Sequence, residues 1–171
     1  MSRPLSFNEY DDAIKRSVSR YWADFPDWLY WKAQLYQESL LDPNATSAVG
    51  AAGVAQFMPK TWIEVTKQLQ RSGASARDAN LAIEAGAFYM ANLRRTWRAP
   101  RPALDRHWLA EASYNAGAGN LVRAQALCRG KALYHEISAC LPQVTGRFAQ
   151  ETLTYVTRID RWRFELSSME Y

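Results

Sequence analysis

Histidine and cysteine are scarce in this chain of 171 residues, which has two of each. His107 and His135 have no cysteine or carboxylate neighbours at the spacing of metal ligands, so we predict neither a metal site nor a cofactor. Eleven residues separate Cys128 from Cys140. We expect two free, half-buried thiols, with a disulfide as the alternative outside a reducing compartment.

Long apolar runs are also absent. No segment has the length and hydrophobicity of a membrane span, and residues 1–3 lead directly into a charged amphipathic segment without the apolar core of a signal peptide. We therefore expect no membrane insertion and no export by an ordinary signal.

The sequence has no useful stretch of alternating apolar and polar residues, no internal repeat and no low-complexity segment. Seven tryptophans and 48% hydrophobic residues suffice for one sizeable core, in which we expect most of the tryptophans. These features predict a mainly α, compact single domain over 1–171. Helices are expected after a capping box at 6–9, around 81–95, over 107–114, from Leu121 after a turn at 115–120, and over 146–166.

One further helix carries a carboxylate on its apolar face. The start signal is the segment 24–27, and Trp28, Trp31, Leu35 and Glu38 then recur at steps of three and four. The segment 41–44 contains a proline and ends the helix, so Glu38 lies in the last turn. An apolar wall and the negative end of the helix dipole would both raise the pKa of this carboxyl group. A buried structural ion pair with an arginine is the alternative.

The segment between Asn44 and Pro59 is small, apolar and too irregular for an amphipathic helix, which predicts a packed loop. Ser47 and Gln56 are its obvious side-chain hydrogen-bond formers. Each has a structural alternative to ligand binding, namely a turn hydroxyl for Ser47 and a clamp on loop carbonyls for Gln56.

Four groups of residues occur in order: Gln37-Glu38-Ser39 with Asn44 and Ser47, the run 50–59, the segment 114–117 and the segment 151–156. Together they resemble the catalytic domain of the soluble lytic transglycosylases, which is related in fold to goose-type lysozyme. Four ordered motifs are more specific than any one of them. The resemblance implies a lysozyme-like helical fold with a substrate cleft, a catalytic core at 28–160 and a helical extension at 1–27.

The resemblance gives the catalytic role to Glu38 and implies that Ser47 and Gln56 hydrogen-bond the substrate or the reacting centre. Met58 would line the cleft, and Tyr114 would approach the catalytic carboxyl group and the sugar. Later in the chain, it implies that Asn115 and Gly117 shape the turn beside Tyr114 and that Glu151 and Tyr155 form part of the cleft floor.

This chain departs from the family pattern at three apolar or small positions. Val54 and Ala55 replace the Leu and Met of Gly-Leu-Met-Gln, and Ser113 precedes the tyrosine where alanine is usual. No polar reacting group changes, so we expect effects on packing and sugar fit and none on the chemistry.

The number of carboxylates separates two chemistries. A glycoside hydrolase normally uses a second carboxylate, and none lies between Asp42 and Glu64. The resemblance therefore implies a lytic transglycosylase, in which Glu38 protonates the oxygen between N-acetylmuramic acid and N-acetylglucosamine, then deprotonates the muramoyl 6-hydroxyl to give a 1,6-anhydro sugar. A hydrolytic muramidase is the alternative, with Asp42, Glu111 or Glu151 as the second carboxylate.

The formal net charge is +4 and the isoelectric point is near 9.2. Both suit attraction to acidic peptidoglycan, whose glycan strands are the expected partner of a monomeric enzyme. The arginines are spread along the chain without a recognised nucleic-acid motif, so we expect no nucleic-acid partner. A basic wall-binding or nucleic-acid-binding protein is the non-enzyme alternative.

A small, basic wall-lytic chain without a signal or wall anchor is typical of a bacteriophage endolysin. Such an enzyme is made in the host cytoplasm and reaches the periplasm through a holin at lysis. A virion-borne enzyme and a secreted effector are the alternatives.

Overall fold

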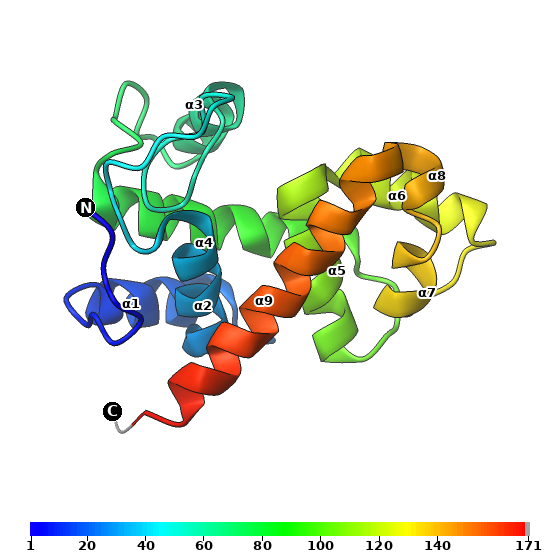
Figure 1. Ribbon diagram of the computed structural model, residues 1–171. Coiled ribbons are helices and arrows are strands. Elements are labelled where there is room, and N and C mark those ends of the chain that lie inside the picture. The colour runs from blue at the N-terminus through cyan, green and yellow to red at the C-terminus, as the bar shows by residue number, and fades with distance from the viewer. Residues whose placement is uncertain (170–171) are drawn as a thin grey trace. The chain divides into compact units, whose positions relative to one another are not determined.

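The computed structural model describes residues 1–169, which are mainly helical as predicted. Within them the only β-type pairings are isolated bridges from Thr46 to Ala52 and from Ala52 to Phe57. The helices are α1 (Asp11–Tyr21), α2 (Trp28–Ser39), α3 (Pro59–Gln68), α4 (Ala79–Thr96), α5 (Ala103–Ala116), α6 (Ala118–Leu127), α7 (Tyr134–Ser138), α8 (Pro142–Thr145), the 3-10 helix η1 (Gly146–Phe148) and α9 (Ala149–Ser167) (Figure 1).

The chain forms two compact units. Unit 1 contains Met1–Tyr89 and the C-terminal segment from Ile159, and unit 2 contains Met90–Arg158. Helices α4 and α9 each contribute residues to both units. The organisation of 1–171 as one domain stays a prediction.

In unit 1, α1 packs against α2 through a buried ion pair. The Lys32 ammonium lies 2.7 Å from Oδ1 of Asp11, and both side chains are buried. Removal of either partner would leave a buried charge uncompensated, which is the costly way to break such a pair.

Two indole rings fix α1 and α2 to α4. Trp22 donates from Nε1 to the carbonyl oxygen of Ala87 at 2.9 Å, and Trp31 donates to that of Ile83 at 3.1 Å. Both tryptophans are fully buried, with ring centroids 6.0 Å apart. A Cβ at Gly86 would lie 2.4 Å from the Trp31 ring, so this glycine allows the helix backbone to touch the indole. The orientation of α2 in unit 1 depends on this contact.

In unit 2, α6 packs against α5, α7 and α8 (Figure 1). The Trp97 indole donates to the hydroxyl of buried Ser113 at 3.0 Å. Only Gly117 separates α5 from α6, with φ of 89°, a value that favours glycine. The predicted turn at 115–120 with a new helix from Leu121 is therefore wrong, since one residue in this conformation makes the break.

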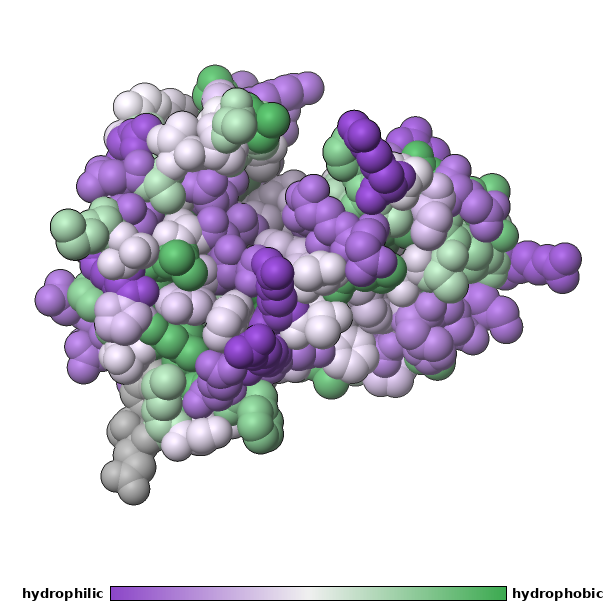
Figure 2. Space-filling view, in the orientation of Figure 1, coloured by the Kyte–Doolittle hydropathy of each residue, from purple (hydrophilic) through white to green (hydrophobic). Residues whose placement is uncertain are grey.

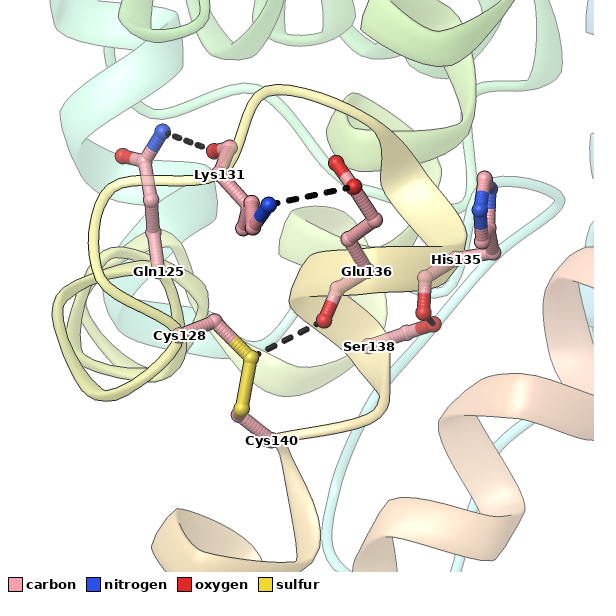
Figure 3. The surroundings of a disulfide bond; sticks show 7 residues. All are labelled: Gln125, Cys128, Lys131, His135, Glu136, Ser138 and Cys140. Atoms are coloured by element: carbon pink, nitrogen blue, oxygen red, sulfur yellow. Dashed lines mark hydrogen bonds and ion pairs between the residues drawn. A yellow bond between two sulfur atoms is a disulfide. The ribbon is translucent and has the colours of Figure 1, made fainter.

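Cys128 and Cys140 form a disulfide, so the prediction of free thiols is wrong. Figure 3 shows how it joins the end of α6 to the segment that follows α7. Inside the loop that it closes, Lys131 pairs with Glu136 at 3.8 Å. Gln125, in α6 before this loop, donates to the Lys131 carbonyl oxygen at 2.8 Å. The sequence spacing permitted the bridge, but the helices that bring the two Cα atoms to 5.9 Å decide it.

The N-terminal helix also starts later than predicted. Helix α1 begins at Asp11, without a side-chain cap, and the proposed capping box at 6–9 lies in turns closed by hydrogen bonds from Phe7 to Pro4 and from Asp11 to Asn8. Residues 6–9 therefore precede the helix, and no capping box at Ser6 starts it.

The visible surface is mixed. On the face in Figure 2, apolar residues occur in small groups among polar ones. None of the helices in the described part of the chain, residues 1–169, combines the length and apolar character required to cross a bilayer.

We expect Gly86→Ala to destabilise the protein by about 1–3 kcal/mol, because the added methyl group would overpack the Trp31 ring. Urea unfolding followed by tryptophan fluorescence measures this change. The control is Gly119→Ala in α6, where a Cβ would meet nothing within 4 Å and should leave stability unchanged or raised by about 0.5–1 kcal/mol. Equal effects of the two substitutions on the free energy of unfolding would contradict a close contact between Gly86 and the Trp31 ring.

Candidate active site

Glu38 is the penultimate residue of α2 and is half-buried. The helix starts as predicted, since the Asp27 side chain caps the Tyr30 N–H, and ends with Leu40 and Leu41 in the left-handed region. The negative end of the helix dipole therefore lies next to the Glu38 carboxyl group. The predicted place of Glu38 in the last turn is confirmed, while the expected rise of its pKa stays a prediction.

The residues on either side of Glu38 are fixed within unit 1. Gln37 accepts a hydrogen bond from the Trp162 indole at 3.0 Å. Buried Ser39 donates to the carbonyl oxygens of Leu35 at 3.2 Å and Val54 at 2.8 Å. The Ser39 hydroxyl thus ties the helix end to the following loop, so that Glu38 sits between two anchored neighbours.

That loop satisfies much of its backbone internally, as predicted. Ala52 and Phe57 exchange two backbone hydrogen bonds of 3.0 and 3.1 Å, and the Gly53 N–H donates to Ala45 at 3.0 Å. A Cβ at Gly53 would lie 1.9 Å from the carbonyl oxygen of Ala76, and its φ is 80°. Glycine is required here because the loop backbone rests directly on another backbone segment.

Ser47 and Gln56 both bond the loop itself. The Ser47 hydroxyl accepts from the Ala51 N–H at 3.0 Å. The Gln56 amide nitrogen donates to the carbonyl oxygens of Ala45 at 3.1 Å and Gly53 at 2.9 Å. These hydrogen bonds are the structural roles that the sequence analysis gave as alternatives to ligand binding. The two bonds of Gln56 use both of its amide protons, so only its carbonyl oxygen remains to meet a ligand. Met58, at the start of α3, is exposed.

The other predicted site residues belong to unit 2. Tyr114 and Asn115 lie in the last turn of α5 and are half-buried, and Asn115 accepts a hydrogen bond from the hydroxyl of buried Thr152 at 2.7 Å. Exposed Glu151 is in the first turn of α9. Tyr155 is buried, so within this structure it is a core residue of the same helix.

A cavity of about 510 Å³ in unit 1 lies away from these residues, between α1 and the start of α4. A cavity of about 480 Å³ in unit 2 is lined by Asn115 and Glu151 together with residues that the sequence did not single out, namely Asn120, Val144, Thr145 and Phe148. No periodic or motif signal marks Phe148, because it lies in a three-residue 3-10 helix. The structure thus brings two predicted residues together here.

Asp42, the first alternative carboxylate, is already engaged. It accepts hydrogen bonds from the Met1 amino group at 2.7 Å and from the Asn44 N–H at 3.0 Å. These bonds, in that order, lower the pKa of Asp42, so its carboxylate is held in the charged, hydrogen-bonded form.

Glu111, the second alternative, is fully buried. Oε1 of Glu111 lies 3.2 Å from Nε2 of His107, and Nδ1 of His107 lies 3.1 Å from the Arg94 guanidinium. Because guanidinium only donates, Nδ1 is the acceptor and Nε2 carries the proton that faces Glu111. Burial, and then the Arg94 charge, place the pKa of His107 well below its usual value. The contact is therefore between the Glu111 carboxyl group and a neutral imidazole.

The mainly helical arrangement of this chain is a lysozyme-like fold, as its likeness to solved structures shows. Its likeness to the 70 kDa soluble lytic transglycosylase of Escherichia coli has a TM-score of 0.74 at 24% identity, over 95% of this chain and 25% of that one. A lytic transglycosylase, Slt, of Pseudomonas aeruginosa, solved as an inactive mutant, gives 0.67 at 21% identity, again over 95% and 25%.

The transglycosylase SLT domain family matches residues 28–136, and the chain belongs to this family. Among curated proteins, it is 32% identical over 133 residues to membrane-bound lytic murein transglycosylase F of Ectopseudomonas mendocina, covering 77% of this chain and 26% of the relative. The protein of the same name from Actinobacillus pleuropneumoniae serotype 5b is 33% identical over 131 residues, covering 73% and 26%. The chain thus spans about a quarter of the length of these relatives.

We expect the protein to lose stability as the pH falls below about 6.5. In the unfolded chain, His107 takes up a proton near its ordinary pKa, whereas in the folded protein the buried imidazole stays neutral. The free energy of unfolding therefore decreases as the pH falls below about 6.5, by up to about 1.4 kcal/mol per pH unit.

Urea unfolding at pH 7.5, 6.5 and 5.5 measures this dependence. His107→Gln should reduce the slope, and His135→Gln, at an exposed position, should keep it. The same slope in wild type and His107→Gln would show that His107 is not its source.

Proposed function

We propose that the protein cleaves the β-1,4 bond between N-acetylmuramic acid and N-acetylglucosamine in peptidoglycan by lytic transglycosylation. The observation that carries the proposal is the single carboxyl group at the anchored end of α2, within a chain that belongs to the transglycosylase SLT domain family. Both curated relatives named above are lytic murein transglycosylases, which supports the same reaction here.

In the proposed reaction Glu38 acts first as general acid. Its proton goes to the glycosidic oxygen as the bond to the anomeric carbon of the muramoyl residue breaks, and the substrate's acetamido group shields the resulting cation. The half-buried position of Glu38 and the adjacent negative helix end both favour the protonated form that this step requires.

Glu38 then acts as general base. The carboxylate takes the proton of the muramoyl 6-hydroxyl, whose oxygen bonds to the anomeric carbon and closes the 1,6-anhydro ring. No water is consumed, and Glu38 ends protonated for the next cycle. One carboxyl group therefore suffices, which agrees with the engaged state of Asp42 and the burial of Glu111.

We assign the supporting roles as follows. Gln56 and Ser47 hold the loop behind Glu38, with the Gln56 carbonyl oxygen as the group left for substrate. Met58, which is exposed, contacts the glycan, and Tyr114 approaches the reacting sugar. Asn115 and Glu151 bind the glycan, and Tyr155 supports Glu151 from within α9.

The biological setting that we propose is host lysis by a phage endolysin that reaches the wall through a holin and acts there as a monomer. Its net charge of +4 supports attraction to the acidic wall polymer. Lysis of bacteria that express the chain together with a holin, and its absence when the holin is omitted, is the expected result. Lysis without the holin would contradict this setting.

We expect Glu38→Gln to lower the rate of glycan cleavage by about 10²–10⁴-fold, because glutamine can neither donate nor accept the transferred proton. The measurement is digestion of purified peptidoglycan, with mass spectrometry of the products. Wild-type products should carry 1,6-anhydromuramic acid. Glu64→Gln, which changes an exposed glutamate of α3, is the matched control and should leave the rate unchanged.

Products heavier by one water would replace the proposal with a hydrolytic muramidase, and exposed Glu151 would become the first candidate for its second carboxylate. No cleavage by the wild-type chain would favour a wall-binding role.

A further inference from the structure

The cavity in unit 2 has one apolar wall that the assigned reaction does not use. At about 480 Å³ it lies within the usual range of small-molecule sites, about 300–1,000 Å³. Phe148 forms part of this wall and is an exposed residue, with 59% of its surface open to solvent.

Polar groups beside the ring are available to a ligand. Asn115 uses its carbonyl oxygen to accept from Thr152, and within residues 1–169 its amide NH₂ has no hydrogen-bond partner. The Glu151 carboxylate likewise has none in the described part of the chain. Asn120 uses one amide proton for the Ala116 carbonyl oxygen at 2.7 Å, which leaves the other for a ligand.

This combination matches the two sides of a pyranose ring. A β-linked hexosamine has an apolar face of C–H groups, which packs on aromatic rings, and an edge of hydroxyl and acetamido groups that donate and accept hydrogen bonds. Donors from Asn115 and Asn120 and an acceptor from Glu151 surround the cavity that Phe148 borders. Exposed Phe164, also an isolated apolar side chain, borders none of the cavities described above and lacks this setting.

We propose that Phe148 is the stacking platform of an N-acetylhexosamine subsite, with Asn115, Asn120 and Glu151 bonding the edge of the sugar. The proposal rests on the function proposed above and adds Phe148 as a residue that positions the glycan strand. Arg147 places its guanidinium over the same ring, 5.1 Å from the centroid. The sugar therefore stacks on the opposite face, and Arg147 lies where a carboxylate of a stem peptide could meet it.

Binding is measured in the Glu38→Gln background, with the β-1,4-linked tetrasaccharide of N-acetylglucosamine as probe and isothermal titration as readout. Addition of Phe148→Ala should weaken binding about 5- to 20-fold, through loss of the apolar contact. Phe148→Leu should weaken it as well, since it keeps bulk without the flat ring, and Phe148→Trp should retain it. Phe164→Ala is the matched control and should bind as the parent does.

Digestion of peptidoglycan separates this inference from the function on which it rests. Phe148→Ala in the otherwise wild-type chain should still give 1,6-anhydro products, with the loss confined to low substrate concentration. Binding by Phe148→Ala within twofold of the parent, or no binding of the tetrasaccharide at all, overturns the subsite. Normal Phe148-dependent binding with no cleavage by the wild type would instead overturn the proposed function and leave the subsite standing.

Discussion

The contact between the Trp31 indole and the backbone of α4 is the constraint on which unit 1 depends. The ring lies where a side chain at residue 86 would be, and its N–H bonds the Ile83 carbonyl oxygen. This fixes the rotation of α2 about its own axis, and Glu38 is seven residues, about two turns, further along the same face. The direction of the proposed catalytic carboxyl group is therefore set by a glycine in another helix, far from it in sequence.

Chemistry with one carboxyl group requires that the other carboxylates of the chain are not available to the reaction. Asp42 is held by the Met1 amino group and the Asn44 N–H, Glu111 is buried against a neutral imidazole, and Glu84 accepts from Tyr21 at 2.9 Å and Arg20 at 3.2 Å. Glu151, the third alternative carboxylate, is exposed and has no hydrogen bond or ion pair within residues 1–169. A substitution at Glu151 therefore distinguishes a role in ligand binding from a role as the second carboxylate of a hydrolase.

Local signals made α2 predictable. Asp27 caps the helix start as predicted, and the helix ends at Ser39, two residues before the predicted stop signal at 41–44. The period of three and four predicted an inward Glu38, which the structure shows as half-buried. The misses come from structure that leaves no periodic signal in the sequence. The start of α1 depends on turns at 4–11, the disulfide on how α6 and α7 pack, and the cavity on α8 and η1, which are too short to show any period. Family motifs named Asn115 and Glu151, and only the fold adds Phe148 beside them.

The short elements also explain why a disulfide lies where it does. Helices of three to five residues, such as α7, α8 and η1, are not stable alone. The free-energy cost of ordering the first helical turn exceeds the gain from its hydrogen bond. Cys140 lies two residues before α8 and is bonded covalently to the end of α6, the helix that carries Asn120. The bond therefore limits how far the wall with Val144, Thr145 and Phe148 can move from the wall with Asn120. We therefore expect the covalent bond to help these short segments keep the width of the proposed subsite.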